Sequence, residues 1–396
     1  MALTSSGSIN INAIVGEFGG SAPHALSEYY RNGGEVPANN TNVPTSGQIS
    51  LSNFYGAVNE IQQVYNSAAT NLNLSSIFGS NWGTAVPKRV VINSGVTIGA
   101  TGTNYAINVP TGMGGTLIID NNGSIEGHGG AVNAGGGGNA IHCAQTSGVT
   151  INNASGAAIK AGGGGGGQGG TGGTGGNGGT GGTGGQGRTT QYRGQVNSSY
   201  NTYNNCVFYF GSWSNGYTFN GPHLAGYGYF GAYYRQNCYR YIHHDGGSGG
   251  AGSTSGGAGG AGGNGGVGQG YNQSSGSGLS GLTGSGGGSG SGGASGNNGS
   301  GAGGTGGTAG TGGTGGTGGN GGSFGNAGAQ GATGAQGNTG ATGSTGANGN
   351  LNNGSGGSSG AAGSGGSSGQ AGGAAGYYIY NRASITFNNS GTYAGN

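Results

Sequence analysis

Residues Gly169–Gly187 read GGTGGTGGNGGTGGTGGQG, with glycine at two of every three positions and Thr, Asn or Gln at the third. A second tract of this kind runs from Gly303 to Gly322, and a third, from Gly325 to Gly349, keeps one glycine per triplet. A period of three is the period of the polyproline-II helix, whose peptide groups make no internal hydrogen bonds. These groups must therefore pair with neighbouring segments or with water. Two glycines per triplet favour an interior helix of a polyglycine-II bundle, and one favours its outer layer or a collagen-like triple helix.

Two other structures are compatible with so much glycine. A flexible Gly/Ser linker has this composition but needs no register, whereas these tracts hold their triplet phase for about twenty residues each. A collagen triple helix is stiffened by imino acids, and the tracts contain no proline. We therefore predict a polyglycine-II helix bundle over residues 161–376, with an insert at 188–245.

The composition of the chain excludes several classes of protein. Of 396 residues 115 are glycine, and charged residues make up 4%, far below the roughly 25% of an ordinary domain. The sequence lacks basic clusters, so we predict no nucleic-acid partner. No apolar run approaches the roughly 20 residues that cross a bilayer, and the N-terminus lacks the charged start and apolar core of a signal peptide. We expect synthesis in a cytoplasm without a signal peptide, and no membrane insertion.

Short β-strands are predicted N-terminal to the glycine tracts. Three β-branched segments are each followed by an Asn/Gly turn and a short apolar return, at 89–98, 115–125 and 149–159. Recurrence of a strand and an Asn-rich turn is typical of the coils of a solenoid. We predict a β-solenoid-like neck at 88–160, with a small sandwich as the alternative. Residues 58–87 are expected to be a connector and 377–396 to form closing strands, which makes the fold mainly β and irregular.

The insert differs in composition from the rest of the chain. Residues 192–241 hold 11 of the 21 tyrosines, together with phenylalanine, tryptophan and arginine. Tyr and Trp supply large, rigid contact area at low entropy cost, and Arg adds forked hydrogen bonds. This composition is typical of recognition loops, with a self-packed aromatic mini-core as the alternative. The predicted binding residues are Tyr192, Tyr200, Tyr203, Trp213, Tyr217, Tyr227, Tyr229, Tyr233, Tyr234, Arg235, Tyr239 and Arg240.

Residues 1–57 form a small N-terminal segment in which SININAI, from Ser8, is echoed by QISLSNF, from Gln48. Each copy is predicted to lead into a helical turn, capped by Asn12 or Ser52, and a further short helix is predicted within 24–34. The segment ISLSNFYG at Ile49–Gly56 resembles a motif of tailed-bacteriophage virion proteins. That resemblance implies a virion-attachment element, with Ile49, Leu51, Phe54 and Tyr55 as its candidate residues.

In combination, the phage-like start, the strand-rich neck, the glycine triplets and the aromatic insert resemble the distal tail-fibre adhesins of T-even-like phages. In that family a polyglycine-II sandwich displays variable loops to a host receptor. The resemblance implies a non-enzymatic adhesin on the tail fibre or tail tip of the virion, made in the host cytoplasm. It implies other tail or fibre proteins as partners of the N-terminus, and a host surface protein or glycan as partner of residues 192–241. The bundle could close within one chain or be shared by a homotrimer.

Two other functions stay open on the sequence. An ice-binding protein could present the row Thr171, Thr174, Thr180 and Thr183, which Asn177 interrupts. A purely structural fibre or spike component would need the glycine scaffold but no binding loop.

Residues with reactive or metal-binding side chains are few. His243–Asp245 could hold a metal ion, but three adjacent residues rarely converge on one ion. Asp120 and Glu126 could be a glycosidase pair, which fits poorly in a chain with 7 acidic residues. Cys206 and Cys238 could form a disulfide, with free buried thiols as the alternative. We predict no catalytic residues, no metal site and no cofactor.

Overall fold

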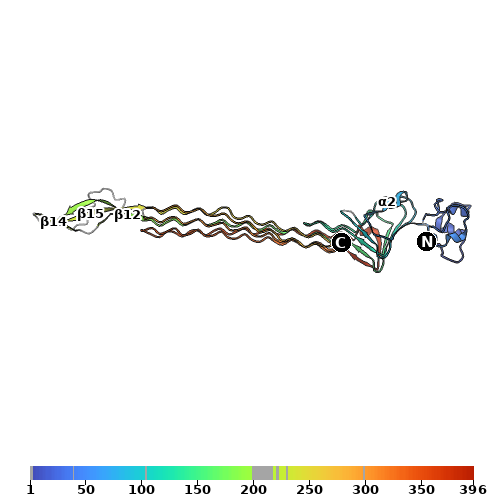
Figure 1. Ribbon diagram of the computed structural model, residues 1–396. Coiled ribbons are helices and arrows are strands. Elements are labelled where there is room, and N and C mark those ends of the chain that lie inside the picture. Colours follow the sequence, from blue (N-terminus) through green and yellow to red (C-terminus); the bar gives the residue numbers. More distant parts are fainter. Residues whose placement is uncertain are drawn as a thin grey trace.

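The computed structural model describes residues 3–38, 40–102, 105–198, 217–219, 223–228, 231–297 and 299–396, and gives the backbone alone for the described residues between 190 and 241. The chain is a rod (Figure 1) with an N-terminal lobe at one end, then a strand domain, a long bundle of extended segments, and a small sheet at the far tip. Strands and irregular segments make up most of the described chain, and its helices are few and short. The predicted mainly β and irregular fold class is confirmed.

The N-terminal lobe contains α1 (Ile11–Phe18) and the 3₁₀ turns η1 (Leu26–Tyr29) and η2 (Leu51–Phe54). Its core is a cluster of buried apolar side chains that includes Phe18, Tyr29 and Phe54. The Phe54 ring packs against both other rings, with centroid distances of 6.3 Å to Phe18 and 6.4 Å to Tyr29. The two copies of the repeated N-terminal motif therefore pack into one small core.

Both predicted helix caps in this lobe are wrong by two residues. Asn10, not Asn12, caps α1, and its side chain accepts a hydrogen bond from a main-chain amide of the first turn at 2.9 Å. Ser50, not Ser52, caps η2 in a capping box. The apolar residue after each observed cap, Ile11 or Leu51, begins the turn and packs against the core.

The helix predicted within 24–34 is also shorter than expected. It is the single turn η1, because Tyr30 already has an extended backbone and Arg31 forms a β-bridge with Val36.

The strand domain consists of parallel sheets of five, five and four strands, and each coil of the chain adds a strand to the sheets. The first sheet contains β1 (Ile61–Tyr65), β4 (Lys88–Ile92), β7 (Leu117–Asn121), β10 (Val149–Asn153) and β17 (Ile385–Asn389). The second contains β2 (Ala69–Thr70), β5 (Thr97–Gly99), β8 (Ser124–Glu126), β11 (Ala158–Lys160) and β18 (Thr392–Ala394). The third contains β3 (Leu72–Asn73), β6 (Ile107–Val109), β9 (Ile141–Cys143) and β16 (Ile379–Tyr380).

Each of the three segments predicted as strands supplies one strand to the first sheet and one to the second. Residues 58–87, predicted as a connector, also belong to this domain, because they supply β1, β2 and β3 and the helix α2 (Leu74–Phe78). Two of these strands are two residues long, too short for a period-two pattern to be visible in the sequence.

The core of the strand domain forms because side chains alternate between the two faces of a strand. In β4, β7 and β10 the first, third and fifth residues are buried. The parallel register stacks Val90 on Ile119 and Ile119 on Ile151. Coils with the same apolar positions therefore build one continuous core.

A buried ladder of asparagines lines the ends of three strands of the first sheet. Asn121 Nδ2 donates to Asn153 Oδ1 at 2.8 Å, and Asn153 Nδ2 donates to Asn389 Oδ1 at 2.7 Å. Asn121 and Asn153 are fully buried, so their amides need these partners. The Asn-rich turns of the sequence therefore also contribute a stack of side-chain hydrogen bonds between coils.

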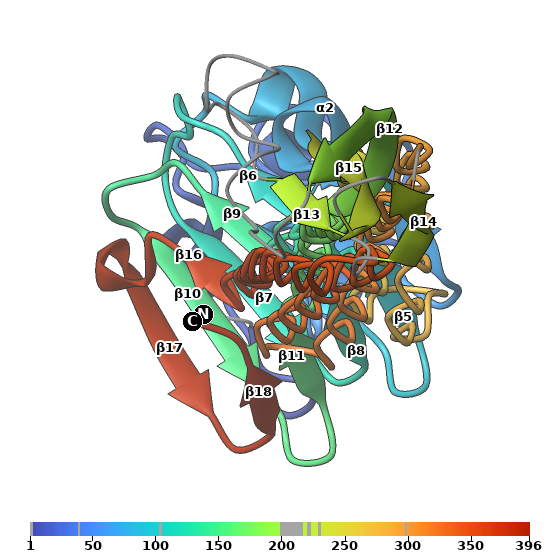
Figure 2. The same cartoon turned by 90° about the vertical axis from the view of Figure 1, so that its left-hand side faces the viewer.

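The bundle emerges from the corner between the second and third sheets. In the first coil this corner is Asn71 alone; in later coils it is 100–106, then 127–140, and finally 161–378. Figure 2 looks along the rod and shows the bundle in front of the strand domain. After the bundle, β16, β17 and β18 add the last strand to each sheet, so both ends of this long connection are anchored in one core.

The bundle is a series of extended segments that run alternately away from and towards the strand domain. We name them run 1 (162–187), run 2 (246–270), run 3 (276–296), run 4 (301–322), run 5 (328–349) and run 6 (354–376). Their main-chain hydrogen bonds recur at every third residue; for example, the amides of Gly169, Gly172 and Gly175 donate to run 2 at 2.8–2.9 Å.

The hydrogen bonds between runs define two layers. Run 1 bonds to runs 2, 4, 5 and 6, and run 4 bonds to runs 1, 2, 3 and 5, whereas run 3 bonds only to runs 2 and 4, and run 6 only to runs 1 and 5. The layers are therefore 2–1–6 and 3–4–5. Runs 1 and 4 occupy the two middle places, and both have two glycines in most triplets. Run 2, which bonds to three other runs, shares this composition. The six runs of one chain bond to one another in these two layers.

Run 2 contains one residue more than the triplet register needs. The run 2 carbonyls that accept from run 1 are three residues apart up to Ser253, but the next one belongs to Gly257. Beside this slip run 4 has Ala309 where its triplet phase otherwise has glycine, and Ala309 is 8% exposed. A β-carbon on Gly288 of run 3 would press on the hydroxyl of Ser253, at 2.7 Å. The extra residue is thus matched by changes in both neighbouring runs.

Candidate functional site

The far tip of the rod is a four-stranded sheet of β12 (Gly187–Ser198), β13 (Tyr217–Phe219), β14 (His223–Gly228) and β15 (Gly231–His244). Its strands are antiparallel, and β12 pairs with β15 from Gly187 opposite His244 to Ser198 opposite Tyr234. The sequence predicted loops here, whereas the described parts of the insert are mostly strands. Aromatic side chains fit a pleated sheet well, so an aromatic-rich composition is compatible with strands as well as with recognition loops.

The tip sheet contains many of the residues predicted to bind. Tyr192 lies on β12, Tyr217 on β13 and Tyr227 on β14. The others on described strands are all on β15: Tyr233, Tyr234, Arg235, Tyr239 and Arg240. Tyr200, Tyr203, Trp213 and Tyr229 lie outside the described residues, as does Cys206, the predicted partner of Cys238.

The backbone register brings four of these residues to adjacent places. Tyr192 is opposite Tyr239, and Arg240 is opposite Tyr217 on the other side of β15. The sheet therefore gathers aromatic and arginine positions from three strands that are distant in sequence. Their role in binding stays a prediction.

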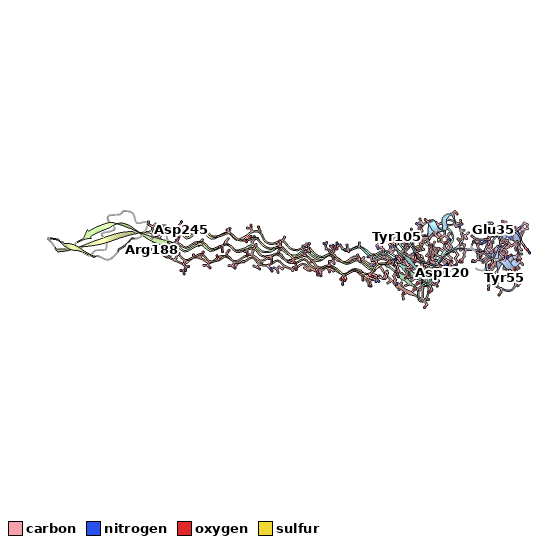
Figure 3. All side chains as sticks on the ribbon, viewed as in Figure 1. Glu35, Tyr55, Tyr105, Asp120, Arg188 and Asp245 are labelled. Carbon is pink, nitrogen blue, oxygen red and sulfur yellow. The ribbon has the colours of Figure 1, made fainter. Side chains whose placement is uncertain are left out.

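The root of the tip sheet is the place where described polar side chains gather. Figure 3 shows Arg188 and Asp245 at this junction with the bundle. The hydroxyl of Thr189 lies 2.8 Å from Nε2 of His244, and Nε2 of Gln186 donates to Asp245 Oδ1 at 3.4 Å. Across the described residues no cluster of three or more His, Cys, Asp or Glu side chains could hold a metal ion.

The residues predicted for virion attachment lie in the N-terminal lobe, where Figure 3 labels Tyr55. Phe54 is fully buried, so it stabilises the lobe and offers no surface to a partner. Ile49 and Leu51 are partly buried against the same core. The Tyr55 hydroxyl donates to the carbonyl of Gly7. The ISLSNFYG motif therefore contributes primarily to the folding of the lobe.

The carboxylates considered as a glycosidase pair are engaged in separate ion pairs. Asp120 pairs with Arg89, which also pairs with Glu60 at 3.0 Å. Glu126 pairs with Lys160 at 3.3 Å. Burial by itself would lower the pKa of Arg89, but its bonds to the two carboxylates raise it. The guanidinium is thus held as a charged partner.

His142 and Cys143 are neighbours in sequence but do not form a nucleophile–base pair. Successive residues of β9 point to opposite faces, and Cys143 is buried while His142 is half-buried on the outer face. Burial raises the pKa of the Cys143 thiol, the opposite of what an activated nucleophile requires. Burial also lowers the pKa of His142, whose ring is stacked between Tyr105 and Tyr380.

The threonine row of run 1 is paired with serines of run 6. The hydroxyls of Thr171, Thr174, Thr180 and Thr183 each lie 2.9–3.0 Å from those of Ser367, Ser364, Ser358 and Ser355, respectively. The same serine hydroxyls accept the amides of those threonines at 2.8 Å. The row is therefore an exposed ladder that joins two runs of one layer.

Residues 60–238 match the family model of the phage tail fibre adhesin Gp38. The match covers less than half of the chain, and this part is similar to a phage tail-fibre adhesin. The resemblance to this family was predicted from the sequence, and the matched part takes in the coils before the bundle, run 1 and most of the tip sheet. No helix in the described part of the chain is long and apolar enough to cross a membrane.

No curated protein matches the chain. The crystal structure of the gp37-gp38 adhesin tip complex of the bacteriophage S16 long tail fiber matches over 99% of this chain and 99% of that chain, with 15% sequence identity and a TM-score of 0.34.

The sequence did not point to two residues at the root of the tip sheet, Asn350 and Asn352. Their side chains bond to Arg188 and Gln186, where run 1 becomes β12. The sequence feature that could have indicated these two residues is the segment NLNN at 350–353. It interrupts the glycine triplets at the turn between runs 5 and 6.

Proposed function

We propose that this chain is a tail-fibre adhesin that binds a host cell-surface receptor, a protein or a glycan, through the tip sheet at 187–244, without catalysing a reaction. The observation that carries the proposal is the position of the aromatic-rich sheet at one end of the rod, opposite the N-terminal lobe (Figure 1). The family match includes residues 187–238 and so supports a role for this part in adhesion.

The bundle acts in this proposal as a rigid polyglycine-II scaffold, and the strand domain as a β-solenoid-like neck. Hydrogen bonds at every third residue support the first assignment, because three residues is the repeat of this helix. Parallel sheets that gain strands coil by coil support the second. A stiff rod keeps the binding surface preorganised, which reduces the entropy lost on binding.

The N-terminal lobe attaches the adhesin to other tail or fibre proteins in this proposal, which locates it on the virion tail. Ile49, Leu51 and Tyr55 are the candidate contacts, because each is only partly buried within the lobe. Phe54 contributes through the core. A homotrimer is not part of the proposal, since the six runs of one chain bond to one another.

Deletion of residues 192–241 tests the receptor-binding proposal. Gln191 would be joined to Ile242 through Asn-Gly. Since Thr189 lies opposite Ile242, this gives a four-residue loop between two antiparallel strands, a common hairpin length. We expect virions with this adhesin to assemble and to lose adsorption to host cells. Virions that carry the shortened adhesin in normal amount and adsorb at the wild-type rate would overturn the proposal.

Ice binding stays a second candidate because the threonine row of run 1 is exposed. The pairing of its hydroxyls with serines leaves fewer of them available to order water. Thermal hysteresis of the purified adhesin decides between the two functions: a purely adhesive protein is expected to show none.

A further inference from the structure

The junction between the bundle and the tip sheet is held by a side chain. Run 1 continues into β12 at Gly187, beside the turn between runs 5 and 6, which contains Asn350. The amide of Arg188 donates to Asn350 Oδ1 at 2.6 Å, and Asn350 Nδ2 donates to the carbonyl of Arg188 at 2.9 Å. The two peptide groups of Arg188 are thus both bonded to one carboxamide.

This arrangement extends the tip sheet by the equivalent of one residue. The sheet order is β12-β15-β13, so β12 is an edge strand with one side unpaired by any described strand. An edge residue directs its free amide and carbonyl outward. A primary carboxamide offers one acceptor and a donor in nearly the geometry of a peptide group. Asn350 therefore takes the place of a neighbouring strand at the root of β12.

The turn that carries Asn350 is itself fixed to the end of the bundle. The amide of Asn350 donates to the carbonyl of Gly299, in the turn between runs 3 and 4, at 2.8 Å. The amide of Leu351 donates to the carbonyl of Gln186 at 3.1 Å, and the amide of Gln186 donates to Asn352 Oδ1 at 2.5 Å. Both distal turns and the end of run 1 are thus joined, and Asn350 transmits this rigidity to β12.

We infer that Asn350 is a positioning residue for receptor binding, which holds the tip sheet in one direction on the bundle. The inference rests on the proposed function, because it concerns how the tip is presented to a receptor. The main chain passes from the bundle into the sheet at the start of β12 and returns to the bundle at the end of β15. Loss of the carboxamide contacts frees rotation at this junction, and that freedom must be removed again on binding.

Substitutions of Asn350 test the contact itself by peptide-resolved hydrogen exchange. Asn350→Leu removes both bonds, whereas Asn350→Asp keeps the acceptor and loses the donor. We expect exchange at 187–191 to be about tenfold faster in Asn350→Leu and less affected in Asn350→Asp, with unchanged exchange in the runs. The control is Asn348→Leu, because Asn348 Oδ1 accepts from the amide of Gly354 at 3.1 Å within the same turn. Equal exchange at 187–191 in Asn350→Leu and the wild type overturns the inference.

Adsorption to host cells tests the functional part. We expect Asn350→Leu to slow adsorption several-fold, Asn350→Asp to slow it less, and Asn348→Leu to adsorb at the wild-type rate. If exchange at 187–191 rises while adsorption stays normal, and deletion of 192–241 still abolishes adsorption, Asn350 is not a positioning residue. If that deletion leaves adsorption unchanged, the proposed function fails and the positioning role fails with it, while the exchange data still decide the contact.

Discussion

Gly175 of run 1 and Gly310 of run 4 lie so close that a β-carbon on Gly175 would stand well under 3.0 Å from the carbonyl oxygen of Gly310. The amide of Gly310 donates to the carbonyl of Gly176 at 2.8 Å. The distance between the two runs is thus set by main-chain hydrogen bonds, and these bonds leave no room for a side chain. Glycine is required in the middle places of the layers for this reason.

Gly175→Ala is therefore expected to destabilise the bundle by about 1–3 kcal/mol, the range typical of overpacking. The matched control is Gly356→Ala in run 6, where a β-carbon would meet nothing within 4 Å. That variant should be neutral or more stable by about 0.4–1 kcal/mol, because alanine restricts the unfolded chain. Chemical denaturation, monitored by hydrogen exchange of the main-chain amides in the runs, measures the change in unfolding free energy of both variants. Similar losses in the two variants would contradict close packing of runs 1 and 4.

The register slip of run 2 predicts a compensating pair of changes. Deletion of Thr254 would restore three-residue spacing, and the β-carbon of Ala309 would then face a carbonyl, as β-carbons on Gly306 and Gly312 would. We expect the deletion alone to destabilise the bundle and the deletion combined with Ala309→Gly to recover most of the loss. Thermal unfolding of both variants measures the coupling. Additive effects would show that Ala309 does not occupy the space made by the extra residue.

The asparagine ladder predicts a large loss for a buried substitution. Asn153→Leu keeps the branched skeleton of the side chain but removes two ladder bonds and leaves the Asn121 amide with fewer partners. We expect a loss of about 2–3 kcal/mol from the strand domain. Asn388→Leu is the control, because exposed Asn388 donates to Asn152 at 2.8 Å on the outer face. A comparable loss in both variants, measured by denaturation, would rule out a special role for the buried ladder.

His142 predicts a dependence of stability on acid. Burial lowers its pKa below the ordinary value of 6.5, so the unfolded chain binds this proton at higher pH than the folded chain. The contribution of His142 to the free energy of unfolding therefore falls as pH drops from 6.5 through the lowered pKa, and the loss is complete below it.

His142→Phe keeps a ring between Tyr105 and Tyr380 and removes the titrating group. The difference in unfolding free energy between this variant and the wild type should shift in favour of the variant as pH falls below 6.5. At neutral pH the variant loses the contact of His142 Nδ1 with Asn108 Oδ1, at 3.0 Å, which costs about 1 kcal/mol. A pH-independent difference between the two proteins would contradict the lowered pKa.

Much of the architecture follows from local patterns in the sequence. The glycine triplets alone indicated extended runs with a three-residue repeat, and the β-branched segments with Asn-rich turns indicated stacked strands. These patterns are readable because each residue of a triplet or strand meets the same environment in every repeat. The composition of residues 192–241 indicated an insert that differs from the rest of the chain. Together with the phage-like motif of the N-terminal segment, it indicated an adhesin.

Other features depend on contacts between segments far apart in the chain. The two-residue strands β2 and β3 exist only because β5 and β6 pair with them. The arrangement of the runs in two layers, and the match of Ala309 to a slip in run 2, depend on which runs become neighbours. The sequence indicates only that Asn350 is a turn residue. The fold brings its carboxamide to Arg188, 162 positions earlier.

The sequence by itself therefore determined the repeats, because a period of three or an alternation of apolar residues expresses a local backbone geometry. Only the tertiary structure decided the order of the runs, the single corner from which the bundle emerges and the fixed junction of the tip sheet. The physical reason is that extended glycine runs carry no side chains that could select a partner. Their pairing is set by main-chain hydrogen bonds that become specific only when the turns at both ends and the strand-domain core hold the runs in register.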